Sequence, residues 1–286
     1  MKRFEHIVIA SDLDGTLLAK NEAGDARNRE RIRYFTENGG HFTIASGRSA
    51  YQIEGRIPYP TDLLNLPAVT ANGTCLYDFA NARAVEEYRM PHATVLHICD
   101  YLKRYFPAVA PRASSPIGML AEDDSNPYIR RDYGFMKNFF HFLPVSEWEK
   151  LGVYKLGLRG DADQISALWK AMERDFADEL EMAPSDATLL DVQVKGRTKA
   201  ALLSEILAQT FSHPVVLCTV GDYDNDVAMH RLADLPCCPD NAVDAVKSIC
   251  RLHLCHHSEG VIGDLIDYLD THDVSHLATK KGNGHA

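Results

Sequence analysis

The sequence predicts an α/β protein whose core is a doubly wound, Rossmann-like parallel sheet, with a second domain of α+β type inserted into it. Short apolar runs end abruptly in polar residues and alternate with segments of helical periodicity. Runs of this kind are typical of parallel strands that are buried on both faces. The alternation stops in the middle of the chain and resumes near Leu190. An interruption of this kind indicates an inserted domain.

Four apolar runs are the predicted core strands, and they cover residues 7–10, 42–45, 68–70 and 214–220. Two periodic segments are the predicted core helices. The first, 26–38, is followed by two glycines, which commonly stand just past the end of a helix. The second, 199–208, follows Thr198, whose side chain suits the cap position at a helix N-terminus.

The insertion is predicted to span residues 81–187, so that the core domain consists of residues 1–80 and 188–271. A helix, a strand and an amphipathic helix are expected within the insertion, near residues 93–105, 153–158 and 162–176. The last stretch, 272–286, is polar and is expected to be a disordered tail.

Composition and charge argue against two classes of partner. The formal net charge of the 286 residues is −10, whereas a nucleic-acid phosphate backbone requires a basic surface. No apolar run approaches the roughly 18 residues of a membrane-spanning helix. The apolar run before Asp12 is also too short for a signal peptide. We therefore expect a cytoplasmic protein that binds neither nucleic acid nor membranes, as a monomer or a small homo-oligomer.

The seven cysteines are irregularly spaced, which favours reduced thiols over a disulfide framework. Five potential metal ligands nevertheless lie close together in the sequence, namely Cys250, His253, Cys255, His256 and His257. The sequence leaves two interpretations of this cluster open. One is a zinc site, and the other is a pair of half-buried cysteines beside a polar loop of histidines.

Polar side chains follow the predicted strands at their carboxyl ends, which is where open α/β sheets bind ligands. Asp12 and Asp14 follow the first strand, Ser46 follows the second and Asp222 follows the last. Several aspartates in one place repel one another unless a cation neutralises them. Oxygen ligands suit a hard divalent cation, and Mg²⁺ is the usual one beside phosphates. The pattern therefore predicts a magnesium site at this edge of the sheet.

Lys199 adds a second positive charge at the start of a predicted helix, and a helix N-terminus itself favours an anion. A divalent cation, a lysine and a helix N-terminus around a carboxylate together favour phosphoryl transfer. The aspartate-rich run that begins at Asp222 does not fit a calcium loop, because Val227 and Ala233 stand where that loop has glycine and glutamate. Asp224 in this run is expected to be exposed on a turn.

Four short motifs resemble those of the haloacid dehalogenase superfamily, and their order and spacing resemble its Cof-type sugar-phosphatase branch. The motifs are Asp-Leu-Asp-Gly-Thr (12–16), Ser-Gly-Arg (46–48), Gly-Arg-Thr-Lys (196–199) and Gly-Asp-Tyr-Asp-Asn-Asp (221–226). The four motifs together are specific, whereas any one alone is weak. The resemblance covers nearly all of residues 5–270. It implies a Mg²⁺-dependent phosphatase of small phosphorylated metabolites, with sugar phosphates expected, and a large cap made by the insertion.

The resemblance also implies a role for each motif residue in catalysis. Asp12 matches the nucleophile that forms an aspartyl-phosphate, and Asp14 matches the general acid and base. Ser46 and Lys199 match the groups that hold the phosphoryl oxygens. An acyl phosphate suits this reaction, because a carboxylate attacks phosphorus and the resulting anhydride is then readily hydrolysed.

The ligands that the resemblance implies for Mg²⁺ are the carboxylate of Asp12, the backbone carbonyl of Asp14 and the carboxylate of Asp222. Asp226 matches an outer partner of the metal or of the lysine. The expected substrate or phosphate contacts are Gly47, Arg48 and Asn225. Pairing of Arg48 with a surface carboxylate is an equally good interpretation.

Two departures from the family pattern bear on local geometry and not on the reaction. Ala200 stands where glycine is more usual, and residues 236–240 carry cysteines and prolines where small apolar residues are usual. Two alternatives remain for the function. A phosphosugar mutase is less favoured because the fourth motif lacks extra glycines, and a non-catalytic regulatory protein is less favoured because every catalytic position is filled. The sequence leaves the phosphorylated substrate itself open, from hexose phosphates to pyridoxal phosphate and flavin mononucleotide.

Overall fold

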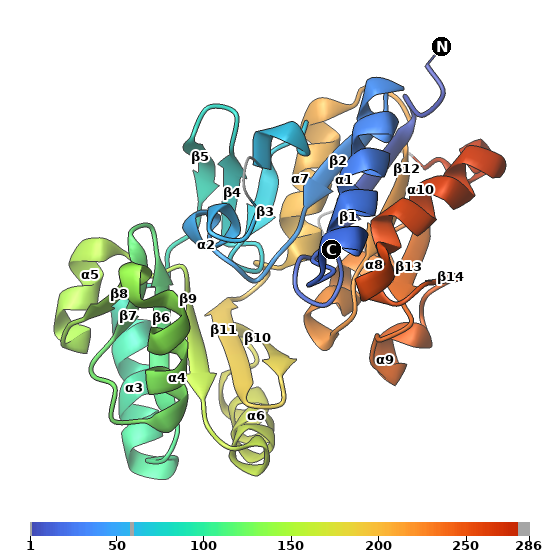
Figure 1. Ribbon diagram of the computed structural model, residues 1–286. Helices are drawn as coiled ribbons and strands as arrows, with labels where there is room; N and C mark the ends of the chain where they lie inside the picture. The colour runs from blue at the N-terminus through green and yellow to red at the C-terminus, as the bar shows by residue number, and fades with distance from the viewer. Residues whose placement is uncertain (1, 58–59, 280–286) are drawn as a thin grey trace. The chain divides into compact units, whose positions relative to one another are not determined.

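The computed structural model describes residues 2–57 and 60–279 and divides the chain into two compact units. The first unit consists of Met1–Val85 and Thr198–Ala286, and the second of Glu86–Arg197 (Figure 1). The second unit is therefore an insertion into the first. Its C-terminal boundary lies later than the predicted 187, because β11 (Leu189–Val194) pairs with β9 and β10 of the inserted unit and not with the core sheet.

The first unit is built on a five-stranded parallel sheet with the order β14-β13-β12-β1-β2. The bounds of its strands are β1 (Ile7–Ser11), β2 (His41–Ile44), β12 (Val216–Val220), β13 (Leu235–Pro239) and β14 (Leu252–Leu254). Every residue of β1 and β12 is buried, as expected for strands covered on both faces. The predicted doubly wound α/β core is confirmed.

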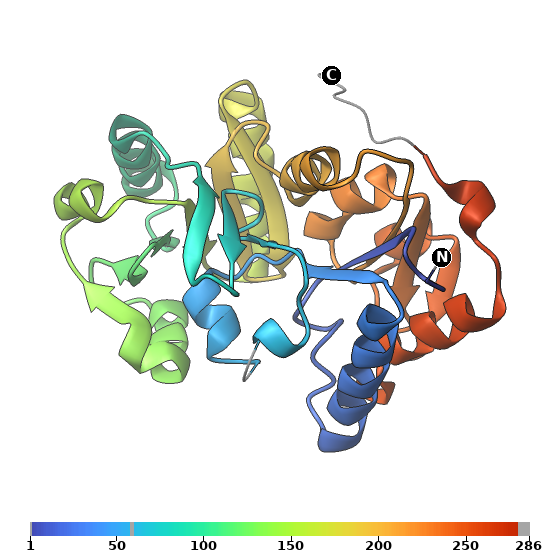
Figure 2. The same ribbon diagram turned by 90° about the horizontal axis from the view of Figure 1, so that it is seen from above.

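Helices cover both faces of this sheet (Figure 2). On one face lie α1 (Glu22–Glu37) and α10 (Val261–Thr271), and on the other lie α7 (Lys199–Thr210) and α8 (Val227–Leu232). The short helices are α2 (Ala50–Glu54) and α9 (Asp244–Lys247). The predicted helix at 26–38 starts earlier, because the Asn21 side chain caps α1 by accepting from the Gly24 N–H at 2.9 Å. Within the described ranges, no helix combines the length and apolarity needed to cross a membrane.

One predicted core strand belongs to a different sheet. β3 (Ala68–Thr70) pairs antiparallel with β4 (Cys75–Asp78), and β5 (Arg83–Glu87) completes this three-stranded sheet. A single parallel bridge, Ala45 to Val69, joins it to the end of β2. This bridge keeps the segment after β3 beside the carboxyl end of β2.

The predicted disordered tail is wrong for the part that the structure describes. Val274 is buried, and Ser275–Leu277 form a short 3-10 helix. Thr279 forms an antiparallel bridge with Val215, and its hydroxyl donates to Asp234 at 2.6 Å. These contacts hold the chain against the first unit. Residues 280–286, which complete the predicted tail, lie outside the described residues.

The inserted unit is of α+β type, with a six-stranded sheet in the order β10-β11-β9-β6-β7-β8. Its other strands are β6 (Ala110–Ser115), β7 (Gly118–Ala121), β8 (Phe140–Phe142), β9 (Lys155–Arg159) and β10 (Leu180–Asp186). Its helices are α3 (His92–Tyr105), α4 (Pro127–Met136), α5 (Trp148–Leu151) and α6 (Ala162–Phe176). Apolar residues of α3 and α6 pack on one face of the sheet and form a separate core. The helix, strand and helix predicted for the insertion correspond to α3, β9 and α6.

Buried charged side chains lie on the face of this sheet opposite the apolar core. Four of them come from the strands, and the fifth comes from α4. Asp132 of α4 is shared by two arginines, with 2.9 Å from its Oδ2 to Nε of both Arg112 and Arg159. On the same sheet Lys155 Nζ lies 2.5 Å from Asp191 Oδ2. All five side chains are at least nine-tenths buried. Strand residues alternate between the two faces, so apolar and charged residues that are neighbours in sequence are kept apart.

We expect Asp132→Asn to destabilise the inserted unit by about 3 kcal/mol, because it removes the carboxylate that two buried guanidiniums share and leaves Arg159 with Asp186 as its ion-pair partner at 2.9 Å. Urea unfolding followed by circular dichroism measures this loss. The matched control is Asp124→Asn, which removes an exposed carboxylate 3.7 Å from Arg130. This control should change stability by no more than about 0.5 kcal/mol. Equal effects of the two substitutions would contradict a structural role for the buried network.

Candidate active site

The loop after β1 places Asp12 at the carboxyl end of the sheet. The Asp12 N–H donates to the Val220 carbonyl at 2.8 Å, which ties the loop to the end of β12. Gly15 follows with a φ of +77°, and a Cβ atom there would lie 2.5 Å from Asp222 Oδ2. Glycine is therefore required at this turn, both for the backbone conformation and for the close approach of Asp222.

Lys199 joins the first and fourth motifs. It is the first residue of α7, it is buried, and Thr198 caps the helix by accepting from the Ala201 N–H at 3.1 Å. Its Nζ donates to Asp12 Oδ1 at 2.5 Å and to Asp226 Oδ1 at 2.6 Å. Although burial opposes the charged form, the negative charges of Asp12 and Asp226 outweigh it and raise the pKa of Lys199. The lysine is thus a fixed cation between two carboxylates.

Asp222 and Asp226 are positioned by the loop after β12. The second oxygen of Asp226 accepts from the N–H of Asp222 at 2.9 Å and of Tyr223 at 3.2 Å, so this loop is closed on itself. Asp222 Oδ1 accepts from the Thr16 hydroxyl at 2.9 Å. Thr16 belongs to the first motif, but sequence reasoning gave it no role.

Negative charge exceeds positive charge where the first and fourth motifs meet. Carboxylate oxygens of Asp12, Asp222 and Asp226 all lie within 4.8 Å of one another, and Lys199 is the cation that contacts this cluster. Burial, opposed by Lys199 and aided by the neighbouring aspartates, raises the pKa of Asp12 well above its ordinary value. Burial and Asp226 raise the pKa of Asp222 to about 7. A divalent cation fits this donor set, because oxygen ligands with surplus negative charge are what such an ion requires.

Asp14 lies on the exposed side of the same loop. Its Oδ1 accepts from Arg48 Nη2 at 2.9 Å and its Oδ2 accepts from Arg48 Nε, while Arg56 Nη1 lies 3.6 Å from Oδ1. Burial alone would raise the pKa of Asp14, but the hydrogen bond and charge of Arg48, together with Arg56, lower it. Arg48 thus pairs with the predicted general acid, and its contact with substrate stays a prediction.

Ser46 and Asn225 approach the site from the ends of β2 and β12. Ser46 is buried, and its backbone N–H donates to the Val69 carbonyl at 2.8 Å. Its Oγ accepts from the Arg48 N–H at 3.2 Å across Gly47. Asn225 Nδ2 donates to Asn72 Oδ1 at 3.3 Å. The turn between β3 and β4 therefore supplies Asn72 as a partner of the fourth motif.

The cysteines and histidines of 250–257 do not gather into a metal site. Among the described residues, the aspartate cluster is the one place where three or more Asp, Glu, His or Cys side chains lie close enough together to hold a metal ion. His253 contacts the Lys247 carbonyl at 3.0 Å, His256 contacts the Ser258 hydroxyl at 2.7 Å and His257 contacts the Leu18 carbonyl at 2.8 Å. The histidines point to separate backbone and hydroxyl partners, so the structure favours the polar-loop interpretation over zinc.

A family model of haloacid dehalogenase-like hydrolases matches residues 9–266. The chain belongs to this family. The resemblance inferred from the four motifs is therefore confirmed. Because haloacid dehalogenase-like relatives are named as phosphatases, the chain is an enzyme of the phosphoric monoester hydrolase class.

Two curated relatives of this haloacid dehalogenase-like hydrolase cover most of its length. The 5-amino-6-(5-phospho-D-ribitylamino)uracil phosphatase YwtE of Bacillus subtilis is 25% identical, over 91% of this chain and 97% of the relative. The pyridoxal phosphate phosphatase YbhA of Escherichia coli is 27% identical, over 84% of this chain and 90% of the relative.

Solved structures of two bacterial proteins show the same fold. A haloacid dehalogenase-like hydrolase from Bacteroides thetaiotaomicron has a TM-score of 0.76 at 21% identity, covering 92% of this chain and 98% of its own. SMU.1108c from Streptococcus mutans has a TM-score of 0.79 at 22% identity, covering 92% of this chain and 99% of its own. At these identities the likeness supports the fold and not a particular substrate.

Proposed function

We propose that this enzyme is a Mg²⁺-dependent phosphatase that hydrolyses small phosphorylated metabolites, sugar phosphates among them, through an aspartyl-phosphate on Asp12. The observation that carries the proposal is the position of Lys199 Nζ, 2.5 Å from Asp12 and 2.6 Å from Asp226, within a cluster of three carboxylates. A nucleophilic carboxylate beside a fixed cation suits attack on an anionic phosphoryl group.

In the first step, a carboxylate oxygen of Asp12 forms a bond to phosphorus while the bond from phosphorus to the ester oxygen breaks. The leaving oxygen takes a proton from Asp14, which acts as the general acid once its carboxylate is released from Arg48 and protonated, because the Arg48 pairing lowers its pKa. Lys199 orients the Asp12 carboxylate and places a positive charge beside the phosphoryl oxygens. The products of this step are the free alcohol and the aspartyl-phosphate.

In the second step, Asp14 takes a proton from a water molecule, and the water oxygen attacks phosphorus. The bond between phosphorus and the Asp12 oxygen breaks, which releases inorganic phosphate and restores the carboxylate. Asp14 thus donates a proton in one step and accepts one in the other. Ser46 and Asn225 are the proposed phosphoryl contacts beside Lys199, with Gly47 and Arg48 completing the strand-end loop.

The proposed ligands of Mg²⁺ are the carboxylates of Asp12 and Asp222 and the backbone carbonyl of Asp14, with Asp226 as an outer partner held by Lys199. When bound, Mg²⁺ would neutralise the surplus negative charge of the cluster and polarise the phosphoryl oxygens. Burial and the neighbouring aspartates raise the pKa values of Asp12 and Asp222, which supports a divalent cation as a partner of this cluster.

The proposed substrates are small phosphate monoesters, and the inserted unit is the proposed source of selectivity among them. The names of the two relatives support this class, since one acts on a phosphoribitylamino-uracil and the other on pyridoxal phosphate. The mutase alternative differs in its product, because it returns the phosphoryl group to a second hydroxyl instead of to water.

Phosphate release from a panel of phosphorylated metabolites, measured with Mg²⁺ and with EDTA, tests the proposal. We expect release that depends on Mg²⁺ from several members of the panel, including sugar phosphates. Release that EDTA leaves unchanged would remove the proposed metal dependence. An isomerised sugar phosphate formed without inorganic phosphate would favour the mutase.

A further inference from the structure

Two guanidinium groups share one carboxylate beside the catalytic loop. Arg48 contacts both oxygens of Asp14, and Arg56 Nη1 lies 3.6 Å from Asp14 Oδ1. Lys20 also acts electrostatically on Asp14. Arg56 follows the C-cap residue Gly55 of α2, so a short helix brings it here from outside the four motifs. Positive charge therefore exceeds negative charge on this side of the loop, in contrast to the aspartate cluster around Asp12.

The arrangement leaves Arg56 available to a further anion. Arg48 already neutralises Asp14 through both carboxylate oxygens, whereas Arg56 makes a longer contact and its side chain is 41% exposed. Burial and the like charge of Arg48 lower the pKa of Arg56. Two cations held close together with one anion between them attract a second anion.

The position of Arg56 gains its meaning from the proposed reaction, and the inference therefore rests on the proposed function. Lys199 lies at Asp12, where the phosphoryl group is transferred, and Arg56 lies at Asp14, which gives a proton to the leaving group. We propose that Arg56 is a specificity-determining residue that binds a second anionic group on the leaving part of the substrate. The enzyme then selects phosphate esters that carry a carboxylate or a second phosphate within a few bonds of the leaving oxygen, such as phosphorylated sugar acids and bisphosphates.

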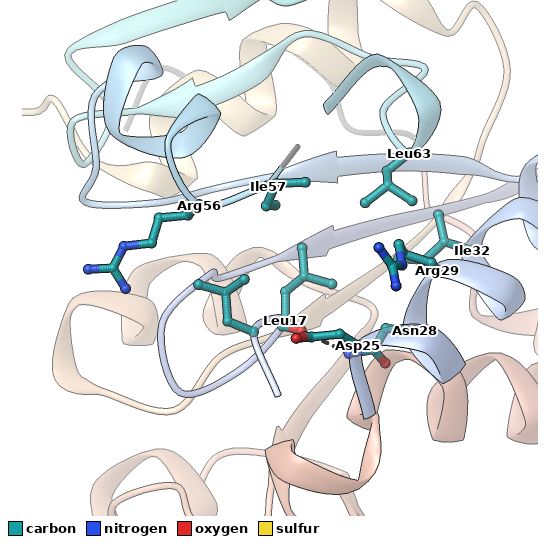
Figure 3. A pocket seen from close by; sticks show the side chains of 9 residues that line it. Leu17, Asp25, Asn28, Arg29, Ile32, Arg56, Ile57 and Leu63 are labelled. Carbon is teal, nitrogen blue, oxygen red and sulfur yellow. Dashed lines mark hydrogen bonds between the residues drawn. The ribbon is translucent and has the colours of Figure 1, made fainter. Parts of the chain in front are cut away.

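A small pocket beside Arg56 supplies a matched control residue. Its volume is about 80 Å³, and it is lined by Leu17, Ile57 and Leu63 as well as by Arg29 and Arg56 (Figure 3). The Arg56 guanidinium extends away from these apolar side chains, and Arg29 lies at the opposite end of the group. Arg29 is an exposed residue of α1, and the ion pairs of Asp14 within the described chain are to Arg48 and Arg56. Arg29→Gln therefore removes a nearby positive charge that does not act at Asp14.

Matched pairs of substrates test the proposed selectivity. 3-Phosphoglycerate carries a carboxylate where glycerol 3-phosphate carries a hydroxymethyl group. 2-Phosphoglycerate and glycerol 2-phosphate differ in the same way, with the carboxylate closer to the ester oxygen. We expect kcat/KM of the wild-type enzyme to be about fivefold or more higher for the carboxylate member of at least one pair, as a partly exposed charge pair allows. Arg56→Gln should bring this ratio close to one, mainly through KM, whereas Arg29→Gln should keep it.

Each outcome of this experiment decides a different question. Wild-type turnover of the glycerol phosphates without preference for the carboxylate member would overturn the role of Arg56 and leave the phosphatase mechanism standing. If Arg56→Gln lowers kcat/KM equally for both members of a pair, Arg56 only supports the loop, and the proposal is also overturned. No turnover of these compounds or of p-nitrophenyl phosphate would remove the proposed function and the inference with it. Thermal melting of both variants checks that they are folded.

Discussion

Asp12→Asn should lower kcat by at least about four orders of magnitude and leave the fold intact. The amide is nearly the same size as the carboxylate, but it is a poor nucleophile and forms no stable acyl phosphate. Lys199 keeps Asp226 as an anionic partner at 2.6 Å, so the variant does not leave a buried ammonium unpaired. Removing one of three crowded carboxylates also reduces their repulsion. We therefore expect a melting temperature no lower than that of the wild type.

The measurements are steady-state phosphate release and rapid acid quench followed by mass spectrometry of the protein. The wild type should show a phosphorylated species during turnover, and Asp12→Asn should not. The control is Asp224→Asn in the same strand-end loop as Asp222, because Asp224 is only partly buried and stands outside the carboxylate cluster. Asp224→Asn should retain most of the activity. Appreciable turnover by Asp12→Asn would remove Asp12 as the nucleophile.

The parts of the core that the sequence predicts well are those in which local pattern and burial agree. β1 and β12 are largely apolar runs that are buried along their whole length, and Asp12 and Asp222 follow them at the same edge of the sheet. α7 follows a capping threonine, which fixes the position of Lys199. Because the site is built from strand ends and one helix start, these local signals were enough to place Asp12, Lys199 and Asp222 together.

The elements that the sequence predicts poorly depend on pairing partners. β13 contains Pro236 and Pro239, and prolines argue against an inner strand. The strand forms nevertheless, with the Pro236 carbonyl accepting from the Arg251 N–H at 2.8 Å. β3 has the apolar pattern of a core strand but pairs antiparallel with β4. β11 alternates like any strand, and only its partners show that it belongs to the inserted unit.

Side chains at the site are also poorly predicted where their role depends on a partner that is distant in the sequence. Thr16 was part of a quoted motif, yet its hydrogen bond to Asp222 spans 206 positions of the sequence. Arg56 carried no signal at all, because an arginine after a short helix is an ordinary surface residue until its neighbours are known. In both cases the contact depends on how the strand-end loops fold over one another.

Removal of Mg²⁺ should abolish turnover and also lower the stability of the first unit at neutral pH. The physical reason is the surplus negative charge of Asp12, Asp222 and Asp226, which a bound cation offsets. At a Mg²⁺ concentration a hundredfold above Kd, binding adds about 2.7 kcal/mol of stability. This corresponds to several degrees in the melting temperature of a protein of this size. Melting curves with Mg²⁺ and with EDTA at pH 7.5 measure the difference.

The metal-free protein should also become more stable as the pH falls from 8 towards 5. Burial raises the pKa of Asp222 to about 7 and that of Asp12 well above its ordinary value. A carboxyl group whose pKa is raised by folding binds its proton more tightly in the folded state, so protonation stabilises the fold over the interval between the unfolded and folded pKa values. Asp222→Asn removes one of these groups. In EDTA, the melting temperature of the variant should therefore rise less on acidification than that of the wild type.

The same variant separates the metal effect from general effects of pH and salt. Asp222→Asn removes a proposed ligand, so Mg²⁺ at pH 7.5 should raise its melting temperature much less than that of the wild type. The other titratable groups are present in both proteins, and their contributions cancel in the comparison. Equal Mg²⁺ shifts in the two proteins would exclude Asp222 as a ligand. Equal pH profiles in EDTA would show that its carboxyl group does not carry the surplus charge.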